Sequence, residues 1–109
     1  MRMWEARVEA MKLLAIGRLR EGADVHEIGC YAREEMAALR QLYRDGAVRE
    51  MYSPGRPGAV LVLEAAGPHD AEAAVAGLPL AAAGLIVFEF IELHPFSALQ
   101  VLFASQVRG

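Results

Sequence analysis

The sequence predicts an α+β domain whose elements follow the order β-α-β-β-α-β. Three stretches rich in apolar and β-branched residues predict strands, at 11–19, 58–66 and 84–93. A segment with apolar residues every three or four positions predicts a long helix after the first strand. A more polar strand at 47–53 and a short alanine-rich helix at 69–76 complete the set. This order is the ferredoxin-like arrangement, with an antiparallel sheet.

The first strand and the long helix have clear boundaries. The strand at 11–19 is apolar on both faces, and Gly22 ends it. Asp24 is expected to cap the helix, with Glu27 three residues later in a capping-box arrangement. The helix is expected to run without interruption for about five turns and to stop at Gly46. Its predicted apolar stripe consists of Val25, Ile28, Ala32, Met36, Leu39 and Tyr43.

The middle of the chain predicts two strands and a short helix. The strand at 47–53 ends at the turn sequence SPGRPG, and the buried, β-branched strand at 58–66 follows it. The short helix at 69–76 is ended by Gly77 and Pro79.

The closing strand at 84–93 contains the most informative residue of the chain. Alternate residues of a strand share one face, so Glu89 lies between Val87 and Ile91 on an apolar face. Both faces of this strand are apolar, so both are expected to be covered. Helices would cover one face, and another surface would cover the other. An ionised carboxylate in such a place must be paired, or burial must favour its neutral form.

The apolar content predicts self-association. Hydrophobic residues make up 55% of 109 residues, which is more than a monomer of this size comfortably covers. With helices on one face of the sheet, either Val60 and Val62 or Leu61 and Leu63 must face away from them. A second copy packed sheet to sheet would cover that face and close an α+β barrel. We therefore expect a homo-oligomer, a dimer at least.

The chain is expected to hold one domain with two short additions. Residues 1–10 are predicted to be an N-terminal extension, 11–97 the ferredoxin-like domain, and 98–109 a C-terminal helical tail. The tail is expected to dock on the domain or on a neighbouring subunit. Its apolar side chains, with that of the residue before it, recur at helical spacing: Phe96, Leu99, Leu102 and Phe103.

Composition argues against several classes of binding partner. A net charge of −3 argues against nucleic acid and against anionic membrane surfaces. No apolar run approaches the length of a bilayer span. The single cysteine, Cys30, excludes an intramolecular disulfide and fits a cytoplasmic location.

Three groups of residues, in order and spacing, resemble the muconolactone isomerase family. They are Glu34-Glu35 through Arg44-Asp45-Gly46 with Val48-Arg49, then Val62-Leu63-Glu64, and finally Leu78-Pro79-Leu80 with Glu89 and His94-Pro95. The resemblance covers most of residues 11–97. It implies a dimeric α+β barrel, a decamer as the assembly, and a role in aromatic compound catabolism. It also implies a cofactor-free isomerase that acts on a small molecule.

The family reaction, a proton shift in an unsaturated lactone, requires a base next to the substrate carbonyl and a donor for the enolate. A carboxylate in a semi-apolar cavity suits the base, and the candidates are Glu89 and Glu35. The structural alternative for Glu89 is an ion pair with an arginine across the dimer. For Glu35 an ordinary solvated helix position is the favoured alternative.

Arg49, Tyr52 and His94 are the substrate-binding candidates. Arg49 can hold a carboxylate in bidentate fashion, or else form an ion pair with Glu50, Glu64 or Glu89. Tyr52, expected on the opposite face of the strand from Arg49, can donate a hydrogen bond or simply pack. His94 can end the strand, donate a hydrogen bond or act as an acid.

No metal and no cofactor is expected. His26 and Cys30 are four residues apart on the long helix, but no third or fourth ligand accompanies them. Cys30 is expected to be a packed thiol rather than a nucleophile.

Two other functions stay open. A non-catalytic barrel that binds a small apolar ligand, or serves in assembly, fits Ala81-Ala82-Ala83, where family members tend to carry aromatic residues. A cofactor-free oxygenase on the same barrel would need a cluster of Trp, Asn and Tyr, and the only tryptophan, Trp4, lies outside the domain.

Overall fold

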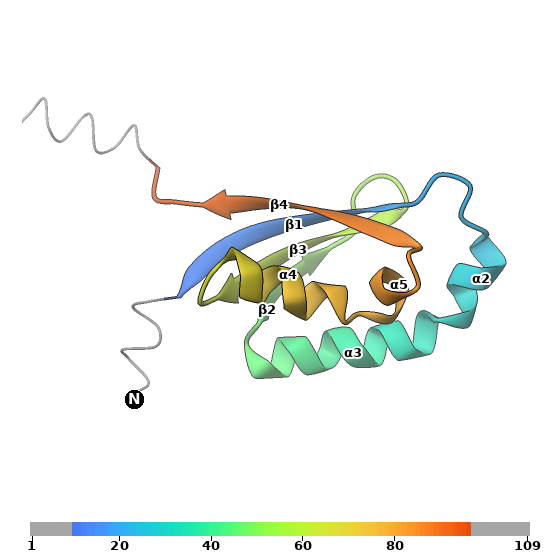
Figure 1. Ribbon diagram of the computed structural model, residues 1–109, viewed down its shortest axis with the longest axis horizontal. Coiled ribbons are helices and arrows are strands. Elements are labelled where there is room, and N and C mark those ends of the chain that lie inside the picture. The colour runs from blue at the N-terminus through green and yellow to red at the C-terminus, as the bar shows by residue number, and fades with distance from the viewer. Residues whose placement is uncertain (1–9, 97–109) are drawn as a thin grey trace, which may run out of the picture.

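The computed structural model describes residues 10–96 of the chain. The predicted tail at 98–109 and all but the last residue of the predicted extension at 1–10 lie outside the described residues. The elements follow the predicted β-α-β-β-α-β order (Figure 1). They are β1 (Met11–Leu19), α2 (Val25–Cys30), α3 (Ala32–Asp45), β2 (Val48–Tyr52), β3 (Gly58–Ala65), α4 (Pro68–Ala76), α5 (Pro79–Ala82) and β4 (Ile86–Leu93).

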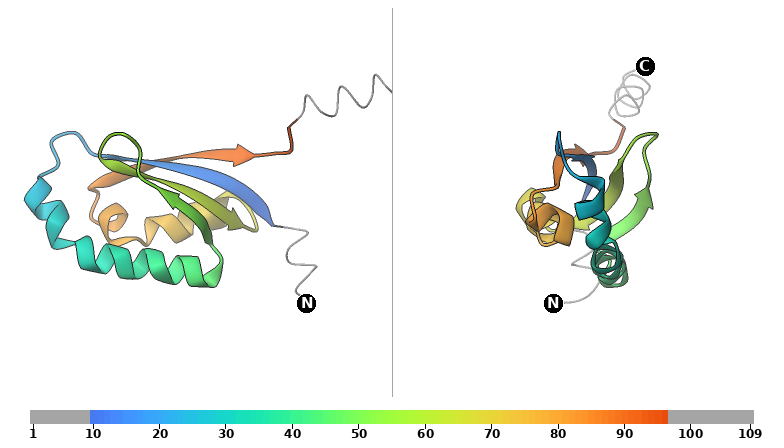
Figure 2. Two further views of the ribbon diagram at one scale, coloured as in Figure 1. Left: turned by 180° about the vertical axis from the view of Figure 1, so that it is seen from behind. Right: turned by 90° about the vertical axis from the view of Figure 1, so that its right-hand side faces the viewer.

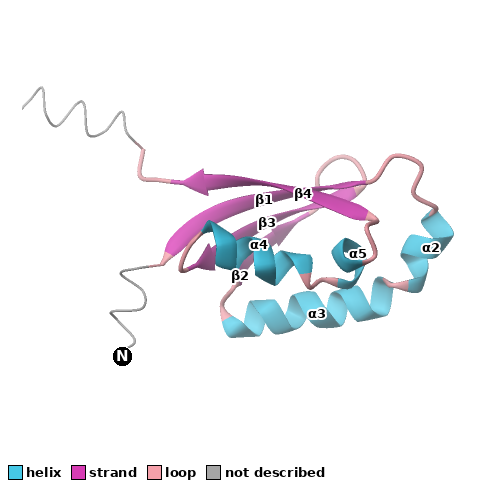
Figure 3. Cartoon of the chain, in the orientation of Figure 1, coloured by secondary structure: helices cyan, strands magenta, loops and turns pink. Residues whose placement is uncertain are grey.

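The four strands form one antiparallel sheet in the order β2-β3-β1-β4. The two central strands, β1 and β3, are the apolar strands predicted to be buried. Helices α3, α4 and α5 all pack on one side of this sheet, as Figures 1 and 3 show. Seen from behind and from the side in Figure 2, no described helix covers the other side.

The long helix predicted after β1 is two helices, so the prediction of an uninterrupted helix is wrong. Helix α2 ends at Cys30 and α3 begins at Ala32. Tyr31 between them caps both, and its backbone N–H donates back to the carbonyl of Ile28 at 3.0 Å. Gly29 lies in the last turn before the break, where its low helix propensity weakens the ladder. Asp24 does cap α2, but its carboxylate accepts from the backbone N–H of His26 rather than that of Glu27.

The break also changes which side of the helix is buried. Val25, Met36 and Tyr43 of the predicted apolar stripe are largely exposed. The side of α3 that packs on the core instead carries Ala38, Leu39 and Leu42, with Glu35 one turn before them. The end of α3 is as predicted, because Gly46 adopts a left-handed conformation with φ 85°.

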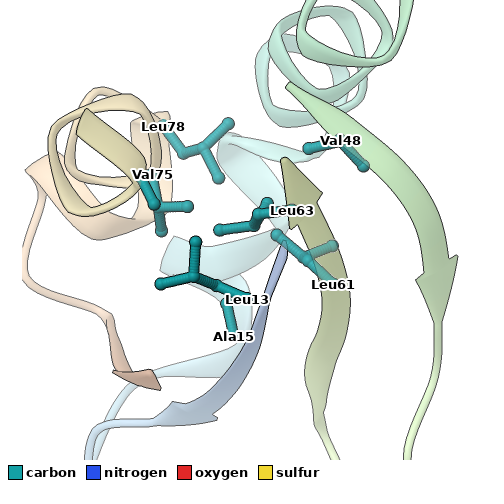
Figure 4. Packing of buried hydrophobic residues seen from close by; sticks show 8 residues of the cluster. Leu13, Ala15, Val48, Leu61, Leu63, Val75 and Leu78 are labelled. Atoms are coloured by element: carbon teal, nitrogen blue, oxygen red, sulfur yellow. The ribbon is translucent and has the colours of Figure 1, made fainter. Parts of the chain in front are cut away.

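The core lies between the sheet and the helices (Figure 4). On the sheet side it contains Leu13, Leu61 and Leu63, and Val75 and Leu78 close it from the helix side. Leu61 and Leu63 therefore face the helices, and Val60 and Val62 face away. Leu78 precedes a short helix that the sequence did not predict, α5, which begins at Pro79.

The uncovered side of the sheet, which we call the open face, is apolar in its centre and charged at its margins. On all four strands it holds the residues that alternate with the buried positions. These are Glu50 and Tyr52 of β2, Val60, Val62 and Glu64 of β3, Lys12, Leu14, Ile16 and Arg18 of β1, and Val87, Glu89, Ile91 and Leu93 of β4.

Candidate functional site

Glu89 lies on the open face in the middle of β4, the edge strand of the sheet. Its Cα pairs with that of Ile16 on β1, and its neighbours along the strand, Val87 and Ile91, are 62% and 40% exposed. Within residues 10–96, Glu89 forms neither a hydrogen bond nor an ion pair. One chain thus presents an exposed carboxylate, without a cationic partner among residues 10–96, on an apolar surface. The surface that was expected to cover this face of β4 is not formed by the described residues of the same chain.

Strand register places Tyr52 in the same cross-strand row as Glu89, at the opposite edge of the sheet. Tyr52 pairs with Val60, which pairs with Ile16, which pairs with Glu89. Three strand spacings separate the two outer residues, or about 14 Å. A single chain therefore does not bring Tyr52 and Glu89 together.

Arg49 occupies an irregularity of β2, where the register with β3 shifts between Val48 and Glu50. Its Nε atom lies 3.5 Å from Oε2 of Glu64 on β3, which is one of the ion pairs anticipated for it. The extra residue inverts the alternation of the strand, so that Arg49 and Tyr52 both reach the open face. The expectation that they face opposite sides is therefore wrong.

The separation of Arg49 and Glu89 within one chain is large. Glu64, the partner of Arg49, lies in the row of Lys12 and Leu93, four residues along β4 from Glu89. This places Arg49 about 13 Å along the strands and about 14 Å across them from Glu89. One chain alone does not bring the two side chains together to bind one small molecule.

Tyr52 donates a hydrogen bond to the carboxylate of Glu50, two residues earlier on the same face. This hydrogen bond, together with the negative charge of Glu50, raises the pKa of the Tyr52 hydroxyl above its ordinary value of 10.0. The phenol therefore stays a donor throughout the neutral range. Glu50 was expected only as a possible partner of Arg49. The signal for its contact with Tyr52 is their spacing of two on a strand, which places both side chains on one face.

Glu35 is not the solvated residue that was favoured, because only 9% of it is exposed. It lies on α3, and its Oε1 atom accepts a hydrogen bond of 2.9 Å from the backbone N–H of Leu80 in α5. Glu35 thus joins two helices on the covered side of the sheet, whereas Glu89 lies on the open face. The two candidate bases are on opposite sides.

His94 follows the end of β4, where its Nε2 atom lies 3.7 Å from Oε2 of Glu92. Both side chains are well exposed, and Glu92 alternates with Glu89, on the same side of the strand as Phe88 and Phe90. The structure therefore does not bring His94 and Glu89 together.

Two hollows on the covered side are lined by other residues. One, of about 450 Å³, lies against α3 and includes Arg33, Met36 and Tyr43. The other, of about 420 Å³, lies between α4, α5 and β4 and includes Phe88 and Phe90. Neither of these two hollows is lined by Glu89, Glu35, Arg49, Tyr52 or His94. A third and smaller hollow, of about 280 Å³, is lined by Tyr52 together with Met36 and Leu39 of α3.

Metal ligands do not cluster in residues 10–96: no group of three histidine, cysteine, aspartate or glutamate side chains is close enough to hold an ion. Cys30, expected to be packed, is exposed. In the same part of the chain, no helix is long and apolar enough to cross a membrane.

Comparison with known proteins identifies the fold. No family model matches the sequence, and no curated protein matches it. Among solved structures, the chain is similar to 5-chloro-2-hydroxyhydroquinone dehydrochlorinase from Burkholderia phenoliruptrix AC1100, in complex with 2,5-dihydroxybenzoquinone. The TM-score is 0.61 at 20% sequence identity, over 81% of this chain and 98% of the dehydrochlorinase chain. This likeness confirms the predicted fold class, the α+β protomer fold of α+β barrel proteins.

Proposed function

We propose that this chain is a cofactor-free isomerase, similar to muconolactone isomerase, that shifts a proton in a small unsaturated lactone or carboxylate. In this proposal the Glu89 carboxylate is the base. It removes a proton next to the substrate carbonyl, a donor stabilises the enolate, and the protonated Glu89 returns the proton at the new position. No redox step is involved.

The observation that carries this proposal is the surroundings of Glu89. The carboxylate stands between Val87 and Ile91 and beside Ile16, with no ion pair or hydrogen bond from residues 10–96. When a second surface covers the open face, water is excluded and no neighbouring cation of the same strand neutralises this group. A carboxylate in a covered, apolar site is the kind of group that serves as a general base.

The other candidates take different roles in the proposal. Arg49, exposed beyond its ion pair with Glu64, would hold an acidic group of the substrate. The Tyr52 hydroxyl, whose one proton is donated to Glu50 in the free chain, would have to exchange that hydrogen bond for one to the enolate oxygen. Glu35 does not share the site, because its hydrogen bond to Leu80 on the covered side already assigns it a structural role.

The dehydrochlorinase offers fold-level support only. Its name and its bound ligand describe an enzyme of small, oxygenated six-membered ring compounds. An α+β protomer of the same fold therefore accommodates chemistry on substrates of about the size proposed here, although a fold on its own does not fix a reaction.

Turnover of muconolactone by matched variants tests the proposal. Glu89→Gln removes the base but keeps the shape, and should lower kcat about 10²- to 10⁴-fold. Glu92→Gln, on the other side of the same strand, is the control and should retain activity. Wild-type protein without activity on unsaturated lactones or carboxylates, or a fully active Glu89→Gln variant, would rule the proposal out.

A non-catalytic module that binds a small apolar ligand is the second candidate. The observation in its favour is the hollow of about 420 Å³ lined by Phe88 and Phe90, which lies away from every acid-base candidate. Under this alternative, Phe90→Ala abolishes binding of an apolar fluorescent dye and Glu89→Gln has no effect. Loss of assembly in Glu89→Gln would instead assign Glu89 to a structural ion pair.

A further inference from the structure

Two of the hollows adjoin between helix α3 and the edge strand β2, which pack against each other. The hollow of about 450 Å³ and the hollow of about 280 Å³ are both lined by Met36, Leu39 and Met51. We call the depression that they form together the α3–β2 groove. Its larger part alone has a volume typical of sites for small molecules, which span about 300–1,000 Å³.

The floor of the α3–β2 groove is apolar and accessible. Met36 and Tyr43 of α3 and Met51 of β2 all line its larger part, and all three are exposed. Beyond them the groove continues to Ala59 and Leu61 at the start of β3. Large apolar side chains that gather in one exposed hollow indicate a binding surface. Methionine suits this role because its flexible thioether adapts to the shape of a ligand.

The rim of the groove is cationic. The charged residues that line its larger part are Arg33 and Arg40, and none of the lining residues is acidic. Within residues 10–96, neither arginine side chain forms an ion pair or a hydrogen bond. The sequence explains this, since no acidic residue lies three or four positions before or after either arginine. On a chain of net charge −3, this positive charge is a local feature.

The spacing of the two arginines leaves room for an anion between them. They are seven residues apart on α3, which is two turns or about 10 Å along the helix axis, so they lie on the same side. Ala37 lies between them and lines the same hollow. Its small side chain leaves space that two long guanidinium side chains can reach from both ends. Guanidinium groups bind carboxylates through paired, charge-assisted hydrogen bonds.

We propose that the α3–β2 groove binds a small amphipathic carboxylate, of the class of medium-chain aliphatic acids. The carboxylate lies between Arg33 and Arg40, and the apolar chain lies over Met36 and Met51. This groove is at the β2 edge of the sheet, whereas Glu89 is on the open face of β4 at the other edge. The site is therefore separate from the proposed site of proton transfer and does not rest on the proposed function.

A peptide strand added to the edge of β2 suits this region less well. The register of β2 with β3 is irregular between Val48 and Glu50, and Arg49 and Glu50 place charges in this edge strand. Irregularities and charged residues in an edge strand oppose its pairing with a further strand. The apolar floor and the cationic rim therefore favour a small molecule over a peptide.

Methionine methyl signals report binding in the groove directly. The chain has five methionines, of which Met36 and Met51 line the groove, whereas Met11 begins β1. Protein labelled with ¹³C at the methionine methyl groups is titrated with octanoate and, in parallel, with 1-octanol, which has the same chain and no charge. Octanoate should shift the Met36 and Met51 signals to saturation and leave Met11 unchanged. Octanol should bind about tenfold more weakly or worse.

A carboxylate inserted between the arginines provides a matched variant. Ala37→Glu adds an acid four residues after Arg33 and three before Arg40, where it pairs with them in place of the ligand. Octanoate binding should weaken about tenfold or more, whereas Ala37→Gln, of the same size and without the charge, should retain it. The combined change Arg33→Gln and Arg40→Gln should weaken binding equally. Arg44→Gln, outside the lining of the larger hollow, should not.

All the substituted side chains are exposed, and circular dichroism confirms folding of each variant before titration. Unmoved Met36 and Met51 signals, or octanol that binds as tightly as octanoate, would overturn the proposal. Equal binding by the wild type and Ala37→Glu, or equal weakening by both Ala37 substitutions, would also overturn it.

Discussion

The side chain of Glu35 on α3 accepts a hydrogen bond of 2.9 Å from the backbone N–H of Leu80, the second residue of α5. This contact spans 45 positions of sequence and links the long helix to the turn that precedes β4. The backbone N–H groups in the first turn of a helix have no partner within the helix, and no side chain of its own caps the start of α5. Glu35 therefore helps to fix the position at which β4 enters the sheet.

Removal of this acceptor should destabilise the fold. Glu35→Ala leaves the Leu80 N–H without its partner, at a cost of about 1–3 kcal/mol in the free energy of unfolding. Glu35→Gln keeps a carbonyl acceptor and should cost less. Urea denaturation measures both, with Glu34→Ala at the exposed neighbouring position as the control. Equal stability of Glu35→Ala and Glu34→Ala would show that the hydrogen bond contributes nothing.

Gly17 provides the space that the Phe88 ring occupies. A Cβ atom at Gly17 would lie 2.6 Å and 2.8 Å from two ring carbons of Phe88 and 2.9 Å from Cδ1 of Ile86. We expect Gly17→Ala to lower the free energy of unfolding by about 1–3 kcal/mol, and Phe88→Leu to reduce that penalty. Gly29→Ala is the control, since nothing lies within 4 Å of its added Cβ, and it should stabilise helix α2. Stabilisation by both alanines would contradict this packing.

The hydrogen bond between Tyr52 and Glu50 gives a pH dependence with a defined sign. Because the pKa of Tyr52 is raised in the folded chain, its contribution to stability is complete below 10.0 and is lost as the pH rises through the raised value. Absorbance titration of the phenol should show Glu50→Gln lowering this pKa. An unchanged titration curve in Glu50→Gln would contradict the contact.

Burial of the open face by a second copy predicts a specific effect on assembly. Ile91 is 40% exposed on this face, and Val25 is 73% exposed on α2, away from it. Ile91→Asp places an unpaired charge in the proposed interface and should convert a dimer to a monomer in sedimentation velocity. Val25→Asp, at the start of a helix, should leave the dimer intact. Identical sedimentation of the two variants would mean that this face is not the interface.

The sequence predicts the strands well, because continuous apolar runs between turn residues have few other solutions. It does not reveal the break at Tyr31, since the spacing of Val25, Met36 and Tyr43 suits one straight helix. Their exposure shows that helical spacing alone does not identify the buried side. The true core-facing side includes a carboxylate, Glu35, whose partner lies 45 residues away, and no local pattern signals that contact.

The candidate site is predictable in part. The alternation of apolar residues correctly places Glu89 on an apolar face, and the ion pair of Arg49 with Glu64 was among the anticipated partners. The irregularity at Arg49 was not foreseen, because it depends on the register with β3 rather than on the sequence of β2. As a consequence, Arg49 and Tyr52 were expected on opposite faces of β2, whereas both reach the open face.

Conversion of muconolactone followed by proton NMR tests the central role of Glu89 most directly. With wild-type protein, the signals of the isomerised lactone should replace those of the substrate. Glu89→Gln of the same oligomeric state should slow this conversion by about 10²- to 10⁴-fold. Equal rates of conversion by wild type and Glu89→Gln, or no isomerised lactone with wild type, would contradict the account.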